Sequence, residues 1–215
     1  MVTEYIRRAY NSIIRPHTPR KIAVFNGVAV RGVRLFDATD SFPDYENALV
    51  AGIRNRVGRG DDVVVGGGRG VSSVAAAHET GSQGSVTAYE GSAERKKLAT
   101  ETVQLNKINE IVKVEHGIVG EGIDLADAPG EAETVATEGL PTCDVLVLDC
   151  EGAEIGILES LDQQPRVIIV ETHAFLDSPE EEVQKALDEL GYEVLNRGVE
   201  AQDMGVYVLT AVKRS

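Results

Sequence analysis

The chain has little of several residue types, and each shortage excludes a class of protein. Only two of its 215 residues are cysteine, and none is tryptophan. Two thiols, Cys143 and Cys150, cannot form the disulfide framework of a small secreted domain, so we expect a reducing, cytoplasmic location. Long apolar runs are also lacking: no stretch is long enough to span a bilayer, and residues 1–14 have no continuous apolar segment like that of a secretory signal.

Basic residues, and lysine above all, are the next shortage. The chain has 35 acids against 21 bases, of which 7 are lysine, and its formal net charge is −14. Such a surface repels nucleic acids and anionic membranes, and no Lys/Arg cluster interleaved with aromatics is present, so we expect neither as a partner. An acidic, lysine-poor surface repels itself, and high salt screens this repulsion, so the composition also predicts a halophilic, archaeal source. The alternative is an ordinary acidic enzyme.

The N-terminal part predicts a small extension ahead of the main domain. Residues 2–15 are expected to form a helix, which Pro16 ends. The pair Asn26-Gly27 between two apolar runs is a strong signal for a β-hairpin. We therefore expect residues 1–43 to form a helix and hairpin extension. Residues 44–215 then form one globular domain, a size that suits a single core.

From residue 44 onward the pattern alternates between helix and strand. Helices are expected at 43–60, 71–78, 92–109, 153–161 and 178–190, and buried strands at 63–65, 85–90, 110–119, 144–149 and 166–171. Residues 120–141 lack apolar periodicity and predict a loop with at most a short helix. The alternation predicts an α/β fold with a mostly parallel sheet covered by helices on both faces.

Several local signals refine these elements. Ser92 is a candidate N-cap of its helix. Ser178 is a candidate N-cap of the last helix, because Pro179 follows it at the first helical position and Gly191 comes just after the C-terminal end. The last two strands, 192–196 and 205–212, are joined by too few residues for a crossover helix and must be antiparallel. The expected sheet is therefore Rossmann-like, with seven strands and an antiparallel last strand.

A glycine-rich turn follows the first strand of the main domain. Its glycines are Gly66, Gly67, Gly68 and Gly70, and such a turn lets a ligand approach the backbone closely. The dinucleotide pattern G-x-G-x-x-G would need Gly or Ala where Val71 stands, and no Gly-Lys-Ser/Thr follows for a P-loop. The alternative is a tight turn that binds nothing.

An acid at the end of the second strand adds to this site. The carboxylate of Glu90 could accept hydrogen bonds from both hydroxyls of a ribose, in NAD or in S-adenosylmethionine alike. The G-x-G-x-G spacing and the antiparallel last strand favour S-adenosylmethionine. One residue departs from the pattern: Val64 stands where class I methyltransferases usually have an acid that helps to order the methionine ammonium group.

A second motif lies at the end of the fourth strand, in DVLVLDCEGAEIGILESL. Asp149 closes the strand, and Glu151 and Glu154 open the next helix, where acids are also favoured for structural reasons alone. At these residues the chain resembles the FkbM family of S-adenosylmethionine-dependent methyltransferases, which carries the signature D-x-E-G-x-E after strand four. The resemblance extends through VTAYEGS, through Leu105-Asn106 and through VIIVETH.

The resemblance implies an enzyme that methylates a hydroxyl of a sugar or another small metabolite. By that resemblance the glycines of the turn pass under the methionine part of the cofactor and Glu90 binds its ribose. Gly91 and the pair His116-Gly117 would line the adenine. Asp149 would lie beside the methionine amino group or the acceptor.

The candidates for activating the acceptor hydroxyl are His173, Glu151 and Asp149. Asp149 with Glu171 and His173 could instead hold Mg²⁺ beside a diol acceptor, but without a matching pair of acids we predict a site with no metal. Two other functions stay open: a nucleic acid or protein methyltransferase, and a catalytically weak module that keeps the fold. We expect the N-terminal region and residues 121–140 to build the acceptor pocket, and a homodimer stays open.

Overall fold

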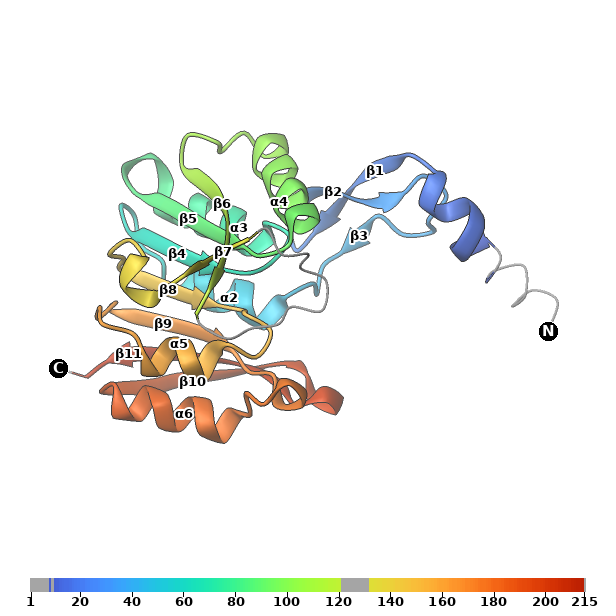
Figure 1. The fold of residues 1–215 in the computed structure, drawn as a ribbon. Coiled ribbons are helices and arrows are strands. Elements are labelled where there is room, and N and C mark those ends of the chain that lie inside the picture. The colour runs from blue at the N-terminus through green and yellow to red at the C-terminus, as the bar shows by residue number, and fades with distance from the viewer. Residues whose placement is uncertain (1–7, 9, 121–131, 215) are drawn as a thin grey trace.

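The structure is a computed structural model that describes residue 8 and residues 10–120 and 132–214. An eight-stranded sheet runs through the main domain in the order β10-β11-β9-β8-β4-β5-β6-β7 (Figure 1). The strands are β4 (Asp62–Gly66), β5 (Ser85–Glu90), β6 (Val112–Val119), β7 (Glu133–Val135), β8 (Val145–Leu148), β9 (Val167–Glu171), β10 (Tyr192–Ala201) and β11 (Val206–Lys213). All neighbouring pairs are parallel except those of β11, which is antiparallel to both β9 and β10.

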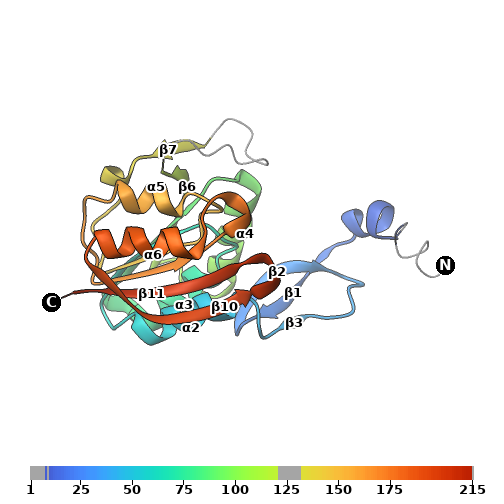
Figure 2. The same ribbon diagram turned by 90° about the horizontal axis from the view of Figure 1, so that it is seen from below.

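Helices cover both faces of this sheet, as the alternation predicts. They are α2 (Asn47–Arg56), α3 (Val71–Thr80), α4 (Ala93–Leu105), α5 (Glu154–Glu159) and α6 (Glu180–Glu189). Along β4, Val63 and Val65 pack in one core cluster with α2 and α3, whereas Val64 packs in the other with α5 and α6 (Figures 1 and 2). Both faces of the strand are therefore buried, which explains its continuous run of valines.

The structure corrects several expected boundaries. The sheet has eight strands rather than seven, because β7 pairs with β6 inside the region expected to be a loop. Residues 121–131 of that region lie outside the described residues. Strand β10 continues to Ala201, since its polar second half still pairs with β11. Helix α6 begins at Glu180 with no side-chain cap, whereas the cap at Ser92 is confirmed: its hydroxyl accepts from the Arg95 N–H.

The N-terminal strands form a separate sheet beside the main domain, in the order β2-β1-β3 (Figures 1 and 2). They are β1 (Arg20–Phe25), β2 (Val28–Arg34) and β3 (Ser41–Phe42). The predicted hairpin is confirmed: Asn26 and Gly27 have φ angles of 45° and 83°, as a type I′ turn requires. Of the expected N-terminal helix, residues 1–7 and 9 lie outside the described residues, and Tyr10–Ile14 form a single π-helical segment followed by a 3₁₀ turn, Arg15–His17.

Several contacts fix this small sheet to the main domain. The side-chain amide of Asn106, at the end of α4, donates to the Ala29 carbonyl at 2.8 Å and accepts from the Ala29 N–H at 3.3 Å. The ring of Phe25 stacks on Phe42 and meets Tyr45 edge-on, with ring centroids 4.4 Å and 5.0 Å apart. The sheet is thereby held next to the segment that leads into α2.

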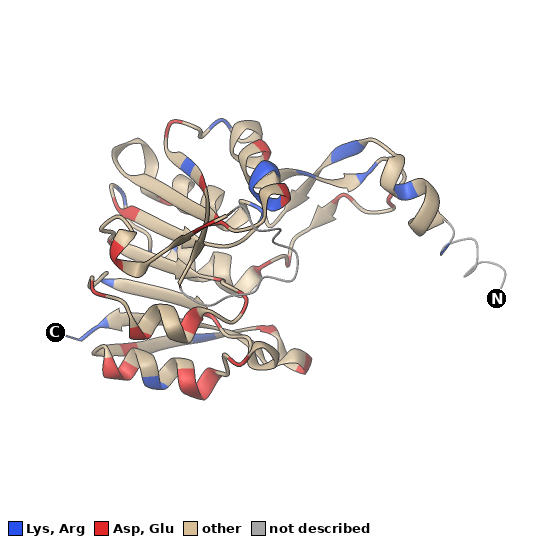
Figure 3. Ribbon diagram, in the orientation of Figure 1, with Lys and Arg blue, Asp and Glu red and all other residues tan. Residues whose placement is uncertain are grey.

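Charge is unevenly distributed over the fold. Basic residues gather on α4 and on the β1–β2 hairpin, while α6 on the opposite side is predominantly acidic (Figure 3). Across the described residues, none of the helices combines the length and the apolar character that crossing a bilayer requires.

Candidate active site

The glycine turn lies at the carboxyl end of β4, in the middle of the sheet. Gly67, Gly68 and Gly70 have φ angles of 86°, 102° and 88°, which L side chains rarely adopt. The Gly67 N–H donates to the Tyr89 carbonyl at 2.9 Å, and the Gly66 carbonyl accepts from the Asp149 N–H at 3.0 Å. The turn is therefore held between the ends of β5 and β8, with its backbone open to one cavity.

This cavity, called here the cofactor cavity, brings together most of the predicted cofactor residues. Gly66, Gly67, Gly68, Glu90, Gly91, Gly117 and Asp149 all line it. The two other candidates have supporting positions. Gly70 precedes α3, where a Cβ would lie 3.1 Å from the backbone of Ala99, so it allows α3 and α4 to pack closely. His116 contacts the Gly91 carbonyl through Nε2 at 3.1 Å and holds that turn.

Glu90 presents an unused acceptor to the cofactor cavity. It is 5% exposed, and its Oε1 accepts the Ser92 N–H at 2.8 Å. Its Oε2 is buried and has no hydrogen-bond partner among the described residues. Burial raises the pKa of this carboxyl group. A buried acceptor without a donor is a site where a ligand hydroxyl fits, so the residues present suit a ribose.

Val64 contributes nothing polar to this cavity. It is 2% exposed and packs in the apolar cluster under α5 and α6. The carboxylates of the cavity come instead from Glu46, Glu90, Asp149 and Glu151.

A second cavity, called here the acidic cavity, adjoins the first. The two share Tyr45, Glu46, Asp149 and Glu151. The rest of the acidic cavity is lined by Asp44, Glu171, His173, Phe175, Leu176 and Glu200. It thus contains six carboxyl groups and one imidazole, at the carboxyl ends of β8 and β9.

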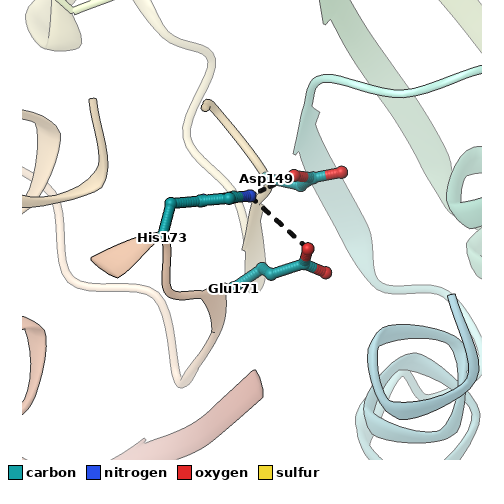
Figure 4. Close-up of side chains that lie close together, drawn as sticks. All are labelled: Asp149, Glu171 and His173. Atoms are coloured by element: carbon teal, nitrogen blue, oxygen red, sulfur yellow. Dashed lines mark ion pairs between the residues drawn. The ribbon is translucent and has the colours of Figure 1, made fainter. Parts of the chain in front are cut away.

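His173 lies at the centre of this group and is 6% exposed. Its Nδ1 is 3.0 Å from Oε1 of Glu154, and its Nε2 is 3.5 Å from both Oδ1 of Asp149 and Oε1 of Glu171 (Figure 4). The His173 backbone exchanges hydrogen bonds with Ser178, which closes the loop after β9. Nε2 therefore faces the cavity, while Nδ1 is anchored behind it.

Glu154, the last acid of the D-x-E-G-x-E signature, is the anchor. It is fully buried and accepts the N–H groups of Cys150 at 2.9 Å and Gly152 at 3.0 Å. Burial alone would raise the pKa of Glu154, but the hydrogen bond and charge of His173 hold it below the usual value. An ionised carboxylate can only accept, so Nδ1 of His173 carries the proton in this contact. Glu154 is thus a positioning residue behind the cavity wall.

Negative charge is crowded in the acidic cavity. Burial, together with the charges of Glu171 and Glu46, raises the pKa of Asp149 well above its ordinary value. Burial also raises the pKa of Glu46 to about 7. Burial alone would lower the pKa of His173, but its contacts with Glu154 and Glu171 and the charge of Asp149 raise it to about 10. The cavity therefore favours a positive charge at the position that these groups surround.

Glu151, the middle acid of the signature, differs from its neighbours. It is half-exposed, has a φ angle of 49°, and forms an ion pair with Arg95 of α4 at 2.5 Å. Both residues of this pair line the cofactor cavity. The Glu151 carboxylate is therefore already paired with the guanidinium group of Arg95.

Some residues of the site carry no signal in the sequence. Glu46 lies within the segment expected to be a helix, and Glu200 lies in the segment expected to be a loop between the last strands. Glu200 reaches the start of α2, where it accepts the N–H groups of Asn47 and Ala48.

A third cavity is surrounded by basic residues that lie in four separate segments of the chain, so the linear pattern does not show them as a cluster. They are Arg20, Arg34, Arg69 and Arg95.

A parallel sheet that ends in an antiparallel strand pair, a glycine turn after its central strand and a buried acid after the next strand define the α/β class of S-adenosylmethionine-dependent methyltransferases. Within that class the chain belongs to the FkbM methyltransferase family, whose domain matches residues 36–194. S-adenosylmethionine is accordingly its methyl donor. None of the curated proteins matches the chain.

Several solved structures share the fold. An S-adenosylmethionine-dependent O-methyltransferase from Thermotoga maritima aligns with a TM-score of 0.53 at 22% identity, covering 81% of this chain and 66% of that one, so the chain spans just under two thirds of its length. TYW2 from P. horikoshii, in complex with MeSAdo, aligns with a TM-score of 0.56 at 19% identity, covering 91% and 72%. A tRNA methyltransferase from M. jannaschii aligns with a TM-score of 0.57 at 15% identity, covering 93% and 58%.

Proposed function

We propose that the protein transfers the methyl group of S-adenosylmethionine to a hydroxyl oxygen of a small acceptor, such as a sugar. The observation that carries this proposal is the junction of the two cavities. Asp149, Tyr45 and Glu46 line both, so a cofactor in the first cavity presents its methyl group to a molecule in the second. In this proposal the acidic cavity is the acceptor site.

The cofactor residues have separate tasks in this proposal. Gly66, Gly67 and Gly68 offer backbone that the methionine part can approach closely, and Glu90 accepts hydrogen bonds from the ribose hydroxyls through its free Oε2. Gly91 and Gly117 line the adenine, while Gly70 and His116 support the turn from behind. Asp149 would lie beside the methionine amino group and accept a hydrogen bond from it, because Val64 offers no polar group there.

When bound, the cofactor supplies a methyl group on a sulfonium, and much of the catalysis is the alignment of the acceptor oxygen with it. The bond between sulfur and methyl breaks as the bond between oxygen and methyl forms, and the hydroxyl proton must leave. We assign the orientation of the hydroxyl to Asp149 and His173, which face the acidic cavity. Glu46, whose pKa of about 7 suits a proton acceptor, receives the proton. Glu151 is paired with Arg95 and positions the turn.

Replacing Glu90 with glutamine should weaken cofactor binding by about tenfold or more, because a hydrogen bond to a charged group contributes about 1.5–3 kcal/mol. Isothermal titration calorimetry with S-adenosylmethionine measures this change. Glu110→Gln is the control, since it removes an exposed carboxylate outside the cavity. Equal affinities for Glu90→Gln and the wild type would show that the ribose does not bind at Glu90.

A screen of acceptors tests the proposed reaction itself. The wild-type protein is incubated with S-adenosylmethionine and, separately, with sugars, other small hydroxylic metabolites, tRNA and cell-extract protein, and S-adenosylhomocysteine release is measured. We expect release with a hydroxylic small molecule. Release with tRNA or protein alone would replace the proposal by a macromolecular methyltransferase. Absence of S-adenosylmethionine binding in calorimetry would instead favour a module that keeps only the fold.

A further inference from the structure

Three metal-binding side chains converge on one point of the acidic cavity. Nε2 of His173 lies 3.5 Å from Oδ1 of Asp149 and 3.5 Å from Oε1 of Glu171, and the three groups offer ligand atoms within 4.8 Å of one another (Figure 4). A separation of 3.5 Å is too long for a good N–H···O hydrogen bond. Around an octahedral ion with ligands at about 2.1 Å, adjacent ligand atoms are about 3 Å apart, so a small inward movement completes the set.

Within the described residues, the carboxylate of Glu171 also has an unpartnered oxygen, Oε2, beside the Oε1 that approaches His173. Glu171 is 8% exposed and lines the acidic cavity. Its Oε2 is buried and has no hydrogen-bond partner in the part of the chain that the structure describes. A buried polar atom left without a partner destabilises the folded protein, and a charged one does so more, so a cation bound to this carboxylate would relieve that cost.

The support behind His173 is a third observation. Nδ1 donates to the buried carboxylate of Glu154 at 3.0 Å, so Nε2 is the ring nitrogen that faces the cavity, where a bound cation would replace its proton. Histidines that bind metal ions characteristically donate their other ring N–H to a carboxylate, because this contact fixes the tautomer and the orientation of the ring. The same arrangement is present here with its open end toward Asp149 and Glu171.

We propose that Asp149, Glu171 and His173 bind a divalent cation in the acidic cavity. Two carboxylates and one imidazole suit Mn²⁺, Mg²⁺ or Zn²⁺, and three protein ligands leave coordination positions open to the cavity. This inference departs from the metal-free site that the sequence predicts. Its consequence rests on the proposed function: the cation makes the acceptor hydroxyl more acidic, the proton passes to Glu46, and the oxygen then takes the methyl group from the sulfonium.

Manganese binding to the full chain tests the site without any acceptor. Titration of Mn²⁺ followed by electron paramagnetic resonance should show one bound ion per chain. Glu171→Gln and His173→Ala should each weaken binding by about 10-fold or more, given that even supporting residues of metal sites are worth about 10–100-fold. Asp44→Asn is the matched control, since it removes an exposed charge from the same cavity but no ligand, and should change the affinity by about twofold at most in physiological salt.

Several outcomes would overturn the proposal. These are the absence of stoichiometric binding, equal weakening by Asp44→Asn and Glu171→Gln, and the absence of imidazole nitrogen coupling in the pulsed spectrum of the wild type. That coupling should disappear in His173→Ala, and Glu171→Gln, which keeps the side-chain shape, covers the case in which His173→Ala does not fold. Calorimetry with S-adenosylmethionine on the same samples separates the two proposals. If the cofactor binds but Mn²⁺ does not, the cation site is refuted and the proposed methyl transfer stands.

Discussion

Replacing Gly67 with alanine should abolish S-adenosylmethionine binding and destabilise the protein by several kcal/mol. A Cβ at this position would lie 1.9 Å from the carbonyl oxygen of Asp149, a backbone atom, and the φ angle of 86° is unfavourable for alanine. Strained backbone of this kind costs about 1–3 kcal/mol. Overpacking a well-packed interior adds about 1–3 kcal/mol. Neither side of the clash can relax cheaply, because hydrogen bonds hold Gly66 to Asp149 and Gly67 to Tyr89.

Urea denaturation and cofactor calorimetry measure the two effects of Gly67→Ala. Gly156→Ala is the matched control: it lies in α5, its added Cβ would meet nothing within 4 Å, and its φ angle is not positive, so it should be neutral or stabilise by about 0.5–1 kcal/mol. Gly68→Ala covers the case in which Gly67→Ala does not fold. Its φ angle is 102° but its Cβ would meet only Ser72, so it should fold and bind the cofactor more weakly. Wild-type stability and affinity in Gly67→Ala would contradict this view of the turn.

The sequence predicted the fold well where local patterns and burial agree. The buried strands β4, β8 and β9 were found because valines, isoleucines and leucines run through them on both faces of the sheet. The Asn26-Gly27 hairpin was found because the two positive φ angles demand those residue types. The strand β7 was missed, since three residues at a sheet edge have no periodicity to detect. The second half of β10 was missed because its residues are mostly polar, so no apolar pattern indicates a strand; backbone pairing with β11 forms the strand there.

Only those residues of the site that lie at the ends of strands could be predicted from the sequence. Gly66, Glu90, Asp149 and His173 lie at or just past the carboxyl ends of parallel strands, which meet at one edge of the sheet. Glu46 lies in the segment leading into α2 and Glu200 lies in β10, and only tertiary packing brings them to the same cavity. The role of Glu154 was also beyond the sequence. Acids are common at a helix start, and nothing in the linear pattern shows that its carboxylate turns back onto Cys150, Gly152 and His173.

Replacing Glu154 with glutamine should lower the rate of methyl transfer by about 10–100-fold while leaving the affinity for S-adenosylmethionine unchanged. Three N–H donors converge on this carboxylate, and an amide offers them only one acceptor oxygen. At least one donor must then face an NH₂ group, and the negative charge that orients His173 is lost. Because Glu154 does not line the cofactor cavity, the loss should fall on kcat and on Mn²⁺ affinity.

The control for Glu154→Gln is Glu159→Gln, which makes the same chemical change at an exposed position of the same helix, α5. A double-mutant cycle distinguishes positioning from a purely structural role, since residues that act as a unit are not additive. If Glu154 acts through the imidazole, adding Glu154→Gln to His173→Ala should have little further effect on the rate. Partial recovery of the rate in Glu154→Asp, which keeps the charge, is also expected. Equal and additive losses in both backgrounds would mean that Glu154 only stabilises the turn after β8.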